Sequence, residues 1–453
     1  MKTYFGTDGI RGRANTFPMT PEVALLLGKA AGSYFRRGNH RHVVVVGKDT
    51  RLSGYMLEYS LIAGFTSAGM DVRTVGPAPT PAIGMLTRAM RADLGVMITA
   101  SHNAYTDNGI KLFGPDGFKL ADAVELEIEK RMENVGSILA VPPVEIGQVA
   151  VYNDARGRYV EAAKAAFPRE LSLDGLKIVL DCANGAGYRV APQALQELGA
   201  EVDAIGVSPN GQNINLNCGS TSPEAMINRV LETGAHIGIA LDGDADRIIV
   251  CDERGRVIDG DQLICRIAKD HRDAGTLKGG GAVATIMSNF AMDRFFKDQG
   301  MSLARTNVGD RYVVDRMRRS GYSVGGEQSG HLVLTDYSTT GDGLIAALQI
   351  LAACVRNDHP VSELCSMFEP APQFKQNVPY TGAMPLNDAA VQAVVEGVQK
   401  RLEGKGRLVV RPSGTEPVVR VMTEGENESL IINAATEVVD ALKHYAHALE
   451  PAE

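Results

Sequence analysis

The chain has 453 residues, of which 44% are hydrophobic and 22% charged, an ordinary composition for a globular protein. Its length suggests about three domains and gives ample material for several hydrophobic cores. The formal net charge of −8 argues against an obligate nucleic-acid binder, because phosphate backbones are bound by a surplus of Lys and Arg. It does not exclude a local basic pocket for a small anion.

The N-terminal segment MKTYFGTDGIRG has glycine and charge where a secretory signal peptide needs an apolar core. The longest apolar segment, at 344–355, is too short to span a bilayer as a helix. The six cysteines form no C-x-x-C pair and no metal-ligand spacing, which indicates free thiols in a reducing compartment. We therefore expect a cytoplasmic protein with neither a membrane nor a nucleic acid as partner.

Apolar runs recur along the chain, each followed by a turn rich in glycine or aspartate; four of them lie at 42–51, 94–103, 176–187 and 236–247. Near-continuous Val/Ile/Leu runs that alternate with helical patterns predict parallel strands covered on both faces. In such sheets the functional groups lie just beyond the C-terminal ends of the strands. Four polar residues occupy those positions: Asp49, Ser101, Asp181 and Asp242.

The C-terminal part has a different design, with an expected strand at 374–378, a helix at 386–402, a strand-loop-strand at 409–425 and a helix at 427–446. This order predicts a small α+β unit rather than another parallel layer. We predict an α/β protein of three similar domains with mixed, mostly parallel sheets, followed by a C-terminal α+β domain. The expected limits are 1–150, 151–254, 255–369 and 370–453.

The segment LDGDADRIIV places Asp242, Asp244 and Asp246 at alternate positions, so an extended backbone would point all three carboxylates one way. Three like charges on one face repel unless a cation lies among them, and hard oxygen ligands suit Mg²⁺ or Ca²⁺. An EF-hand loop is disfavoured, because Arg247 stands where that loop needs glycine and an apolar strand pattern follows. A solvated acidic turn without metal is the remaining alternative.

The segment VVRPSGTEPVVR combines two arginines with a flexible glycine and two hydroxyl residues. Guanidinium groups and clustered backbone N–H donors fit a dianion such as phosphate. A hairpin turn whose arginines face water is the alternative. No G-x-x-x-x-G-K-[ST] motif is present, so a nucleotide-binding P-loop is not indicated.

The segment GGEQSGH carries Glu327 and Ser329 two positions apart, which in an extended loop places a carboxylate and a hydroxyl on the same side. Such a pair is suited to binding sugar hydroxyls, because a carboxylate accepts two O–H bonds. His331 adds a group that titrates near neutrality. A glycine-rich turn without a binding role fits the same residues.

Ser101 follows an apolar run but lacks the G-x-S-x-G context of a hydrolase nucleophile, since Thr99 and Asn103 stand at the glycine positions. With an acidic loop and an arginine loop elsewhere in the chain, we expect Ser101 to carry a phosphoryl group, whose oxygens would complete a Mg²⁺ shell. Lys111 would balance charge or move a proton. A helix N-cap is the structural alternative for this serine.

Five motifs, in this order and spacing, resemble those of the α-D-phosphohexomutases: FGTDGIRG (5–12), TASHN (99–103), LDGDADR (241–247), GGEQSGH (325–331) and RPSGTEP (411–417). The resemblance covers the whole chain. It implies four domains around one central cleft, the first three similar and the fourth a mobile lid. Homodimerisation through the first domain is a further expectation from the family.

The resemblance also implies roles for individual residues. Ser101 would be the phosphorylated residue, and one Mg²⁺ per chain would be bound by it together with Asp242, Asp244 and Asp246. Glu327 and Ser329 would hold the sugar hydroxyls. The phosphate that is not transferred would be held by Arg411, Ser413, Gly414, Thr415 and Arg420. Near the reacting groups the family places Arg11, Lys111, Arg247 and His331.

The implied reaction moves a phosphoryl group between the 6- and 1-positions of a phosphosugar, with glucose or glucosamine 1,6-bisphosphate as activator or intermediate. Lys111 is the first candidate for proton transfer and His331 the second. The FGTDGIRG start and Gln328 favour the branch that acts on glucosamine phosphate, on the route to UDP-N-acetylglucosamine. The branch that acts on mannose and glucose phosphates, which typically has methionine at the position of Gln328, is the alternative.

Two departures from the family are Ala104, where many relatives have proline, and Pro412, where many have lysine. The second removes a cation beside the phosphate loop, while Arg411 and Arg420 remain. Two other functions use the same motifs: a non-catalytic phosphosugar-binding protein and a Mg²⁺-dependent sugar phosphatase. The first would be expected to lose Ser101 or one of the aspartates, and all are present here.

Overall fold

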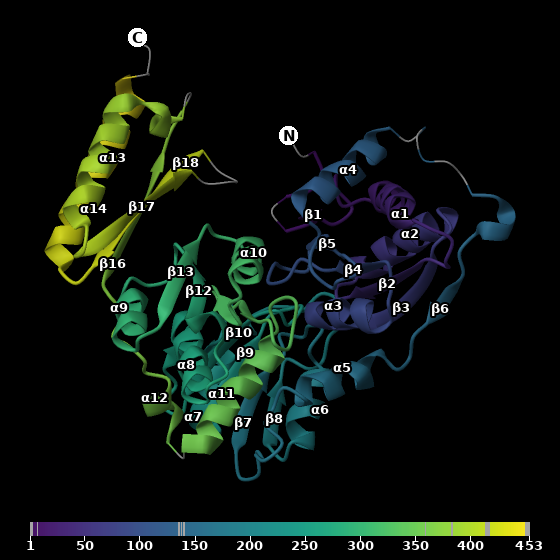
Figure 1. The fold of residues 1–453 in the computed structure, drawn as a ribbon, viewed down its shortest axis with the longest axis horizontal. Helices are drawn as coiled ribbons and strands as arrows, with labels where there is room; N and C mark the ends of the chain where they lie inside the picture. The colour runs from purple at the N-terminus through teal and green to yellow at the C-terminus, as the bar shows by residue number, and fades with distance from the viewer. Residues whose placement is uncertain are drawn as a thin grey trace. The chain divides into compact units, whose positions relative to one another are not determined.

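The computed structural model of the chain describes residues 3–6, 8–134, 136, 138, 141–357, 359–381, 384–412 and 417–448. The fold divides into two compact units, one of Met1–Thr285 with Ala304–Ser366 and one of Ile286–Leu303 with Met367–Glu453. Figure 1 shows the elements of both units in chain order from purple to yellow.

The first sheet has six strands in the order β1-β5-β4-β2-β3-β6. Their bounds are β1 (Ile10–Arg13), β2 (Val43–Lys48), β3 (Asp71–Pro77), β4 (Leu94–Ile98), β5 (Asp107–Phe113) and β6 (Val149–Val151). Strands β2, β3, β4 and β6 are parallel, and β5 is antiparallel to both β4 and β1. The run of valines in β2 thus forms a central strand, as its composition predicted.

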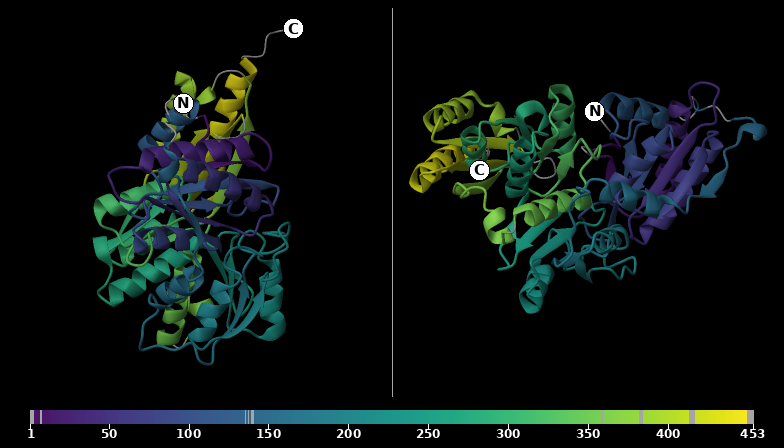
Figure 2. Two further views of the ribbon diagram at one scale, coloured as in Figure 1. Left: turned by 90° about the vertical axis from the view of Figure 1, so that its right-hand side faces the viewer. Right: turned by 60° about the horizontal axis from the view of Figure 1, so that its bottom comes forward.

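Helices cover both faces of this sheet (Figures 1 and 2). They are α1 (Pro21–Phe35), α2 (Ser53–Ser67), α3 (Thr80–Ala89), α4 (Asp122–Glu133) and α5 (Ala155–Lys164). Val44 and Val46 pack in one core with residues of α1, α2 and α4. Val45 packs in a second core with residues of α3 and α5. The division follows from the strand geometry, in which successive side chains point to opposite faces.

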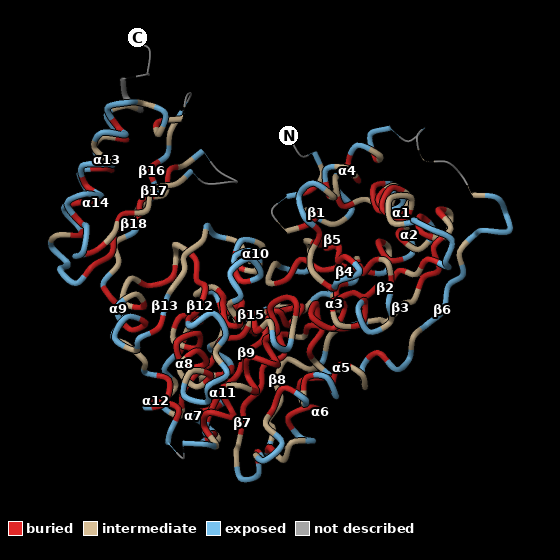
Figure 3. The backbone as a smooth tube through the Cα atoms, in the orientation of Figure 1, coloured by how far each residue is buried: buried red, intermediate tan, exposed pale blue. Residues whose placement is uncertain are grey.

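The second sheet has the order β11-β10-β9-β7-β8. Its strands are β7 (Lys177–Asp181), β8 (Glu201–Ile205), β9 (Ile237–Leu241), β10 (Ile248–Asp252) and β11 (Val257–Ile258), with helices α6 (Val190–Glu197) and α7 (Glu224–Thr233). Strand β7 is parallel to β8 and β9, whereas β10 is antiparallel to β9 and β11. Because β9 is buried along its whole length, the turn after it begins in the protein interior (Figure 3).

The third sheet has the order β13-β12-β14-β15 and again mixes parallel and antiparallel pairs. Its strands are β12 (Gly281–Thr285), β13 (Ser302–Thr306), β14 (Val324–Gly326) and β15 (Leu332–Leu334), with helices α8 (Gly260–Asp273), α10 (Asp310–Ser320), α11 (Gly343–Asn357) and α12 (Val361–Leu364). The longest apolar segment of the sequence forms most of α11, which is a buried helix of this unit (Figure 3).

The second unit contains the sheet β16-β18-β17, in which both pairs are antiparallel. Its elements are α9 (Ala291–Asp298), β16 (Gln373–Pro379), α13 (Ala389–Leu402), β17 (Gly406–Pro412), β18 (Val418–Gly425) and α14 (Glu428–Ala448). Helix α13 begins three residues later than predicted, because Pro385–Asn387 forms a separate 3-10 turn and the Asp388 side chain caps the helix.

The predicted fold class, three α/β sheets followed by a C-terminal α+β unit, is confirmed. The expected domain limits remain predictions. All six cysteines are free and buried. Within the described residues, no helix is both long and apolar enough to cross a membrane.

A buried carboxylate at the start of α11 makes stability depend on pH. Asp342 accepts hydrogen bonds from the Tyr159 hydroxyl at 3.0 Å and the Ile345 amide at 3.0 Å. Burial raises its pKa from 3.8 to about 6. A carboxyl group whose pKa is higher in the folded state than in the unfolded state stabilises the fold. This contribution to the free energy of unfolding is fully present below the unfolded pKa and is lost as the pH rises through the folded pKa.

We therefore expect Asp342→Asn, which keeps the acceptor for Ile345, to remove a decline in stability of about 3 kcal/mol between about pH 4 and pH 7. Urea unfolding of both proteins across this range is the measurement. An Asn variant whose free energy of unfolding falls with pH as steeply as that of the unchanged chain would contradict the assignment to Asp342.

Candidate active site

Ser101 lies in the turn that follows β4, three residues beyond Ile98, where groups at the carboxyl edge of the sheet were predicted. It is buried, and its φ of +52° is in the left-handed region, which is strained for a serine. Its Oγ donates to Asp242 Oδ2 at 2.6 Å and lies 3.3 Å from His102 Nδ1. The helix N-cap alternative is therefore wrong, because the serine lies in a turn between two strands.

His102 does not carry positive charge at neutral pH. Burial, together with the nearby charges of Arg247 and Arg11, lowers its pKa to about 4. A neutral imidazole beside Ser101 adds no cation to the site, so the positive charge must come from other residues.

Arg51 supports the Ser101 turn and was not identified from the sequence. Its fully buried guanidinium pairs with Asp49 at 2.8 Å. It also donates to backbone carbonyls of the turn, among them those of Ser101 and Asn103, each at 2.9 Å. Asn215 donates to the same two carbonyls from the second sheet's domain, at 2.9 and 3.0 Å. The conformation of Ser101 is thus fixed by side-chain donors from two segments, the buried Arg51 and the partly buried Asn215.

Replacing Arg51 by methionine would leave Asp49 buried without a cation and the turn without its donors. We expect the free energy of unfolding to fall by about 3–5 kcal/mol, the usual cost of breaking a buried ion pair. Urea denaturation measures it, with Arg229→Met as the matched control, since Arg229 pairs with Asp203 at a half-exposed position. If both variants lost the same stability, the supporting role of Arg51 would be refuted.

Asp242, Asp244 and Asp246 lie in the turn between β9 and β10, and one carboxylate oxygen from each lies within 4.8 Å of the others. All three are buried. The expectation of an extended backbone is wrong: the segment is a turn in which Ala245 has a φ of +57°, and the turn makes the carboxylates converge.

Two details of this turn bear on the prediction. Ile248–Asp252 forms strand β10, so the segment is not an EF-hand loop, as expected. A Cβ on Gly243 would lie 2.5 Å from the Ser101 carbonyl oxygen, so glycine is needed for the two turns to touch.

The buried aspartates have the properties of cation ligands. Burial and the charges of Asp246 and Asp244 raise the pKa of Asp242 well above its usual value. Within the described residues, Asp244 Oδ1 and Asp246 Oδ1 are buried with no hydrogen-bond partner. Buried carboxylate oxygens without donors are costly unless a cation binds them. The donor set, three hard oxygens, therefore fits a divalent metal ion.

Lys111 is the cation closest to this cluster. Its Nζ lies 2.9 Å from Asp244 Oδ2, 3.1 Å from Asp246 Oδ2 and 3.4 Å from Asp8 Oδ2. Burial opposes its charge, but these three carboxylates outweigh burial and raise the pKa of Lys111 well above its usual value. Lys111 is therefore protonated at neutral pH.

Three further charged residues, Asp8, Lys119 and Asp310, join this network and were not among the predicted site residues. Lys119 donates to both Asp8 and Asp310. Burial works against the charge on Asp8, yet Lys111, Lys119 and Arg11 lower its pKa well below the usual value. The result is a chain of alternating charges in which Lys111 is buried and Asp8, Lys119 and Asp310 are partly buried, so each charge needs its partner.

His331, Glu327 and Ser329 follow β14. The buried His331 places Nε2 3.5 Å from Asp310 Oδ2 and 3.8 Å from Asp246 Oδ2. The expected extended segment is again wrong: Glu327 and Gly330 close a turn through a 3.0 Å backbone hydrogen bond. Glu327 accepts from the Gly309 amide at 3.0 Å, and Ser329 is exposed.

A cavity of about 210 Å³ brings the separate motifs together. Six of the predicted residues line it, namely Arg11, Ser101, Asp246, Arg247, Glu327 and His331. They come from four segments far apart in the sequence. Asp8 and Asp310 also line the cavity. Its lining therefore combines carboxylates, cations and a hydroxyl group.

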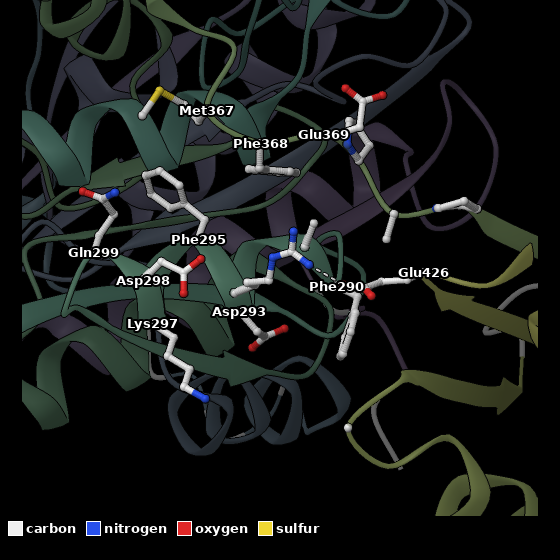
Figure 4. Close-up of a pocket in the computed structure, with 16 residues that line it drawn as sticks. Phe290, Asp293, Phe295, Lys297, Asp298, Gln299, Met367, Phe368, Glu369 and Glu426 are labelled. Atoms are coloured by element: carbon white, nitrogen blue, oxygen red, sulfur yellow. Dashed lines mark hydrogen bonds and ion pairs between the residues drawn. The ribbon is translucent and has the colours of Figure 1, made fainter.

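A larger cavity, of about 870 Å³, lies in the second unit between α9 and residues 367–372 (Figure 4). Its lining mixes acidic, basic and aromatic side chains, and Arg294 pairs there with Glu426. None of the predicted site residues that the structure describes lines it. Volume alone therefore does not identify the candidate site.

The arginines of the predicted phosphate loop lie in the second unit, where Arg411 of β17 is directly opposite Arg420 of β18. Burial and the charge of Arg420 lower the pKa of Arg411. Like charges in register are unfavourable without an anion, so the pair fits an anion site. Ser413, Gly414 and Thr415 lie outside the described residues.

Sequence comparison identifies the class of protein. Models of the phosphoglucomutase/phosphomannomutase family match residues 2–138 (alpha/beta/alpha domain I), 157–255 (domain II), 259–371 (domain III) and 376–441 (C-terminal domain). The chain belongs to this family.

Similar relatives carry a more specific name. A phosphoglucosamine mutase of Caulobacter vibrioides is 59% identical over 443 residues, which are 98% of this chain and 99% of the relative. A phosphoglucosamine mutase of Azorhizobium caulinodans is 57% identical over 445 residues, with the same coverage of both chains.

Solved structures share the fold over nearly the whole length. A phosphoglucomutase/phosphomannomutase family protein of Burkholderia thailandensis has a TM-score of 0.82 at 24% identity, covering 99% of this chain and 98% of that one. The Aspergillus fumigatus N-acetylphosphoglucosamine mutase, in complex with GlcNAc-6P and magnesium, has a TM-score of 0.68 at 19% identity, covering 98% and 96%.

Proposed function

We propose that the chain interconverts glucosamine 6-phosphate and glucosamine 1-phosphate through a phosphoserine at Ser101. The substrate is supported by the name shared by full-length relatives that are 57–59% identical. The observation that supports the chemistry is the cavity lined by Ser101, Arg11, Arg247 and His331. The Ser101 Oγ lies 2.6 Å from Oδ2 of Asp242, one of the three candidate metal ligands.

Asp242, Asp244 and Asp246 would hold the metal ion, together with a phosphate oxygen on Ser101. We assign Mg²⁺, one per chain, because three carboxylates and a phosphate are hard oxygen ligands. When bound, the ion neutralises charge on the transferred phosphoryl group.

The chain's own residues position the phosphoryl group and move the protons. Phosphoserine 101 gives its phosphoryl group to the free hydroxyl of a sugar monophosphate, which yields a 1,6-bisphosphate; after reorientation, its other phosphate returns to Ser101. Lys111, protonated at neutral pH, would give a proton to the serine oxygen. His331, whose ring nitrogens have no hydrogen-bond partner within the described residues, would accept the proton of the sugar hydroxyl.

The remaining predicted residues would bind the substrate. Glu327 and Ser329 would hold ring hydroxyls in both orientations of the sugar, and Arg11 and Arg247 would balance the charge of the phosphoryl group. Arg411 and Arg420, with Ser413, Gly414 and Thr415, would hold the other phosphate. Glucose or glucosamine 1,6-bisphosphate would serve as activator.

The proposal also covers the whole protein. It includes four domains, closure of the last domain as a lid, a homodimer and a cytoplasmic location.

The experiment is a coupled assay that compares glucosamine 6-phosphate, mannose 1-phosphate and glucose 1-phosphate, with released phosphate measured in parallel. We expect isomerised glucosamine phosphate at the highest kcat/KM and no accumulation of free phosphate. If mannose and glucose phosphates both reacted faster, the substrate would be wrong. If free phosphate accumulated without isomerisation, the chain would be a phosphatase, and if no sugar reacted it would be a binding protein.

A further inference from the structure

A second group of metal-type side chains lies at the other end of the first sheet. His40 Nε2 lies 2.8 Å from Asp93 Oδ1, and His42 Nδ1 lies 3.4 Å from the same oxygen. One ligand atom from each of the three residues lies within 4.8 Å of the others. His42 and His40 stand just before β2, and Asp93 just before β4. None of the motifs assigned to the reaction includes these residues.

We propose that His40, His42 and Asp93 form a binding site for a divalent transition-metal ion of the zinc type. Zinc bonds to nitrogen and oxygen are about 2.0–2.2 Å, so two ligands of one tetrahedral ion are about 3.3 Å apart. The separations of 2.8 and 3.4 Å from Asp93 Oδ1 to the two histidine nitrogens need only small side-chain movements to reach that value. Three protein ligands would leave one coordination position for water.

The carboxylate and one of the histidines are held in place before any ion binds. Asp93 Oδ2 accepts from the Val43 amide at 2.8 Å, and the Asp93 amide donates to the Val43 carbonyl at 2.9 Å. This leaves Oδ1 for the histidines. The His42 ring is buried and its centroid lies 4.1 Å from that of His40. Outer-shell hydrogen bonds of this kind fix ligand geometry in metal sites.

The group is accessible to solvent, and the arginine between the two histidines pairs with a different carboxylate. The His40 side chain is 59% exposed, which opens the site to solvent. Arg41, between the two histidines, pairs instead with Asp71 at 2.7 Å. Because zinc binds the unprotonated nitrogen of a neutral imidazole, protons compete with the ion and binding weakens as the pH falls.

The donor set separates this site from the aspartate cluster. Two imidazoles and one carboxylate suit zinc, copper or nickel, whereas three carboxylates suit magnesium. The ion would join the amino ends of β2 and β4, and Ser101 follows the carboxyl end of β4, a five-residue strand of roughly 17 Å. We therefore expect it to stabilise the first sheet and to leave turnover unchanged.

The test uses the full-length chain without a histidine tag, in excess Mg²⁺, titrated with Zn²⁺ by calorimetry and with Co²⁺ by visible absorption. We expect one Zn²⁺ per chain, a tetrahedral Co²⁺ spectrum and a higher Tm with Zn²⁺. His40→Ala, at an exposed position, should weaken Zn²⁺ binding at least about tenfold, and turnover measured without Zn²⁺ should not change.

Two further variants make the result decisive. His359→Ala removes an exposed histidine that lies 3.7 Å from a single carboxylate, and it should bind Zn²⁺ like the unchanged chain. Asp244→Asn alters the aspartate cluster and should also bind Zn²⁺ like the unchanged chain. Equal affinity in His40→Ala, loss of the ion in Asp244→Asn, or an octahedral Co²⁺ spectrum would each overturn the proposal, as would no Zn²⁺ binding at all.

Discussion

Ser101→Ala is expected to reduce mutase turnover by at least about 10⁴-fold, the scale of losing a covalent nucleophile. Alanine has no oxygen to carry the phosphoryl group. The structural cost is small, because the Oγ makes one 2.6 Å bond to Asp242, a contribution of about 1 kcal/mol. Steady-state rates with glucosamine 6-phosphate and a bisphosphate activator provide the measurement.

Ser60→Ala is the matched control for this substitution. Ser60 lies in the same domain, in α2, and donates to the Met56 carbonyl at 2.9 Å. It should keep normal turnover, and both variants should keep a Tm close to that of the unchanged chain. Substantial turnover in folded Ser101→Ala would mean that no phosphoserine lies on the reaction path.

Asp244→Asn is expected to have the second largest effect, through the metal site and Lys111 together. The substitution keeps the shape of the side chain but removes the charge that Lys111 approaches at 2.9 Å, and it weakens one of three metal ligands. Because a bound metal contributes several kcal/mol to the transition state, we expect kcat to fall at least roughly 100-fold. The increase in Tm that Mg²⁺ gives the unchanged chain should also disappear.

The control for charge loss is Asp203→Asn, which removes a carboxylate in the same domain whose partner is the half-exposed Arg229. It should retain turnover and the response to Mg²⁺. EDTA should abolish turnover of the unchanged chain, and added Mg²⁺ should restore it. If Asp244→Asn kept both its activity and its Mg²⁺-dependent Tm, the aspartates would not be the metal ligands.

The strands and the polar groups beyond their ends could be predicted, because a strand buried on both faces has a continuous run of apolar residues. The valine run at 43–46 and the apolar run at 237–241 both became central strands. Ser101 and Asp242 follow such strands, and the carboxyl edge of a sheet is where reactive groups are expected. The backbone between the aspartates was not predicted correctly, because alternate spacing fits both a strand and a tight turn.

The residues that the sequence did not reveal act over long distances. Arg51 looks like a surface arginine before a helix, yet it is buried and binds carbonyls of residues 101 and 103. Lys119 bridges Asp8 and Asp310, which are separated by 302 positions, and no local pattern records such pairs. Asp8 was within reach, because it lies in the FGTDGIRG motif, whereas Lys119 and Asp310 required the tertiary structure.

The most direct measurement is mass spectrometry of the intact chain after incubation with glucose 1,6-bisphosphate, followed by digestion. The mechanism predicts one added phosphate per chain, located on the peptide that contains Ser101 and removed when glucosamine 6-phosphate is supplied. A folded, active chain whose Ser101 peptide never acquires phosphate would contradict it.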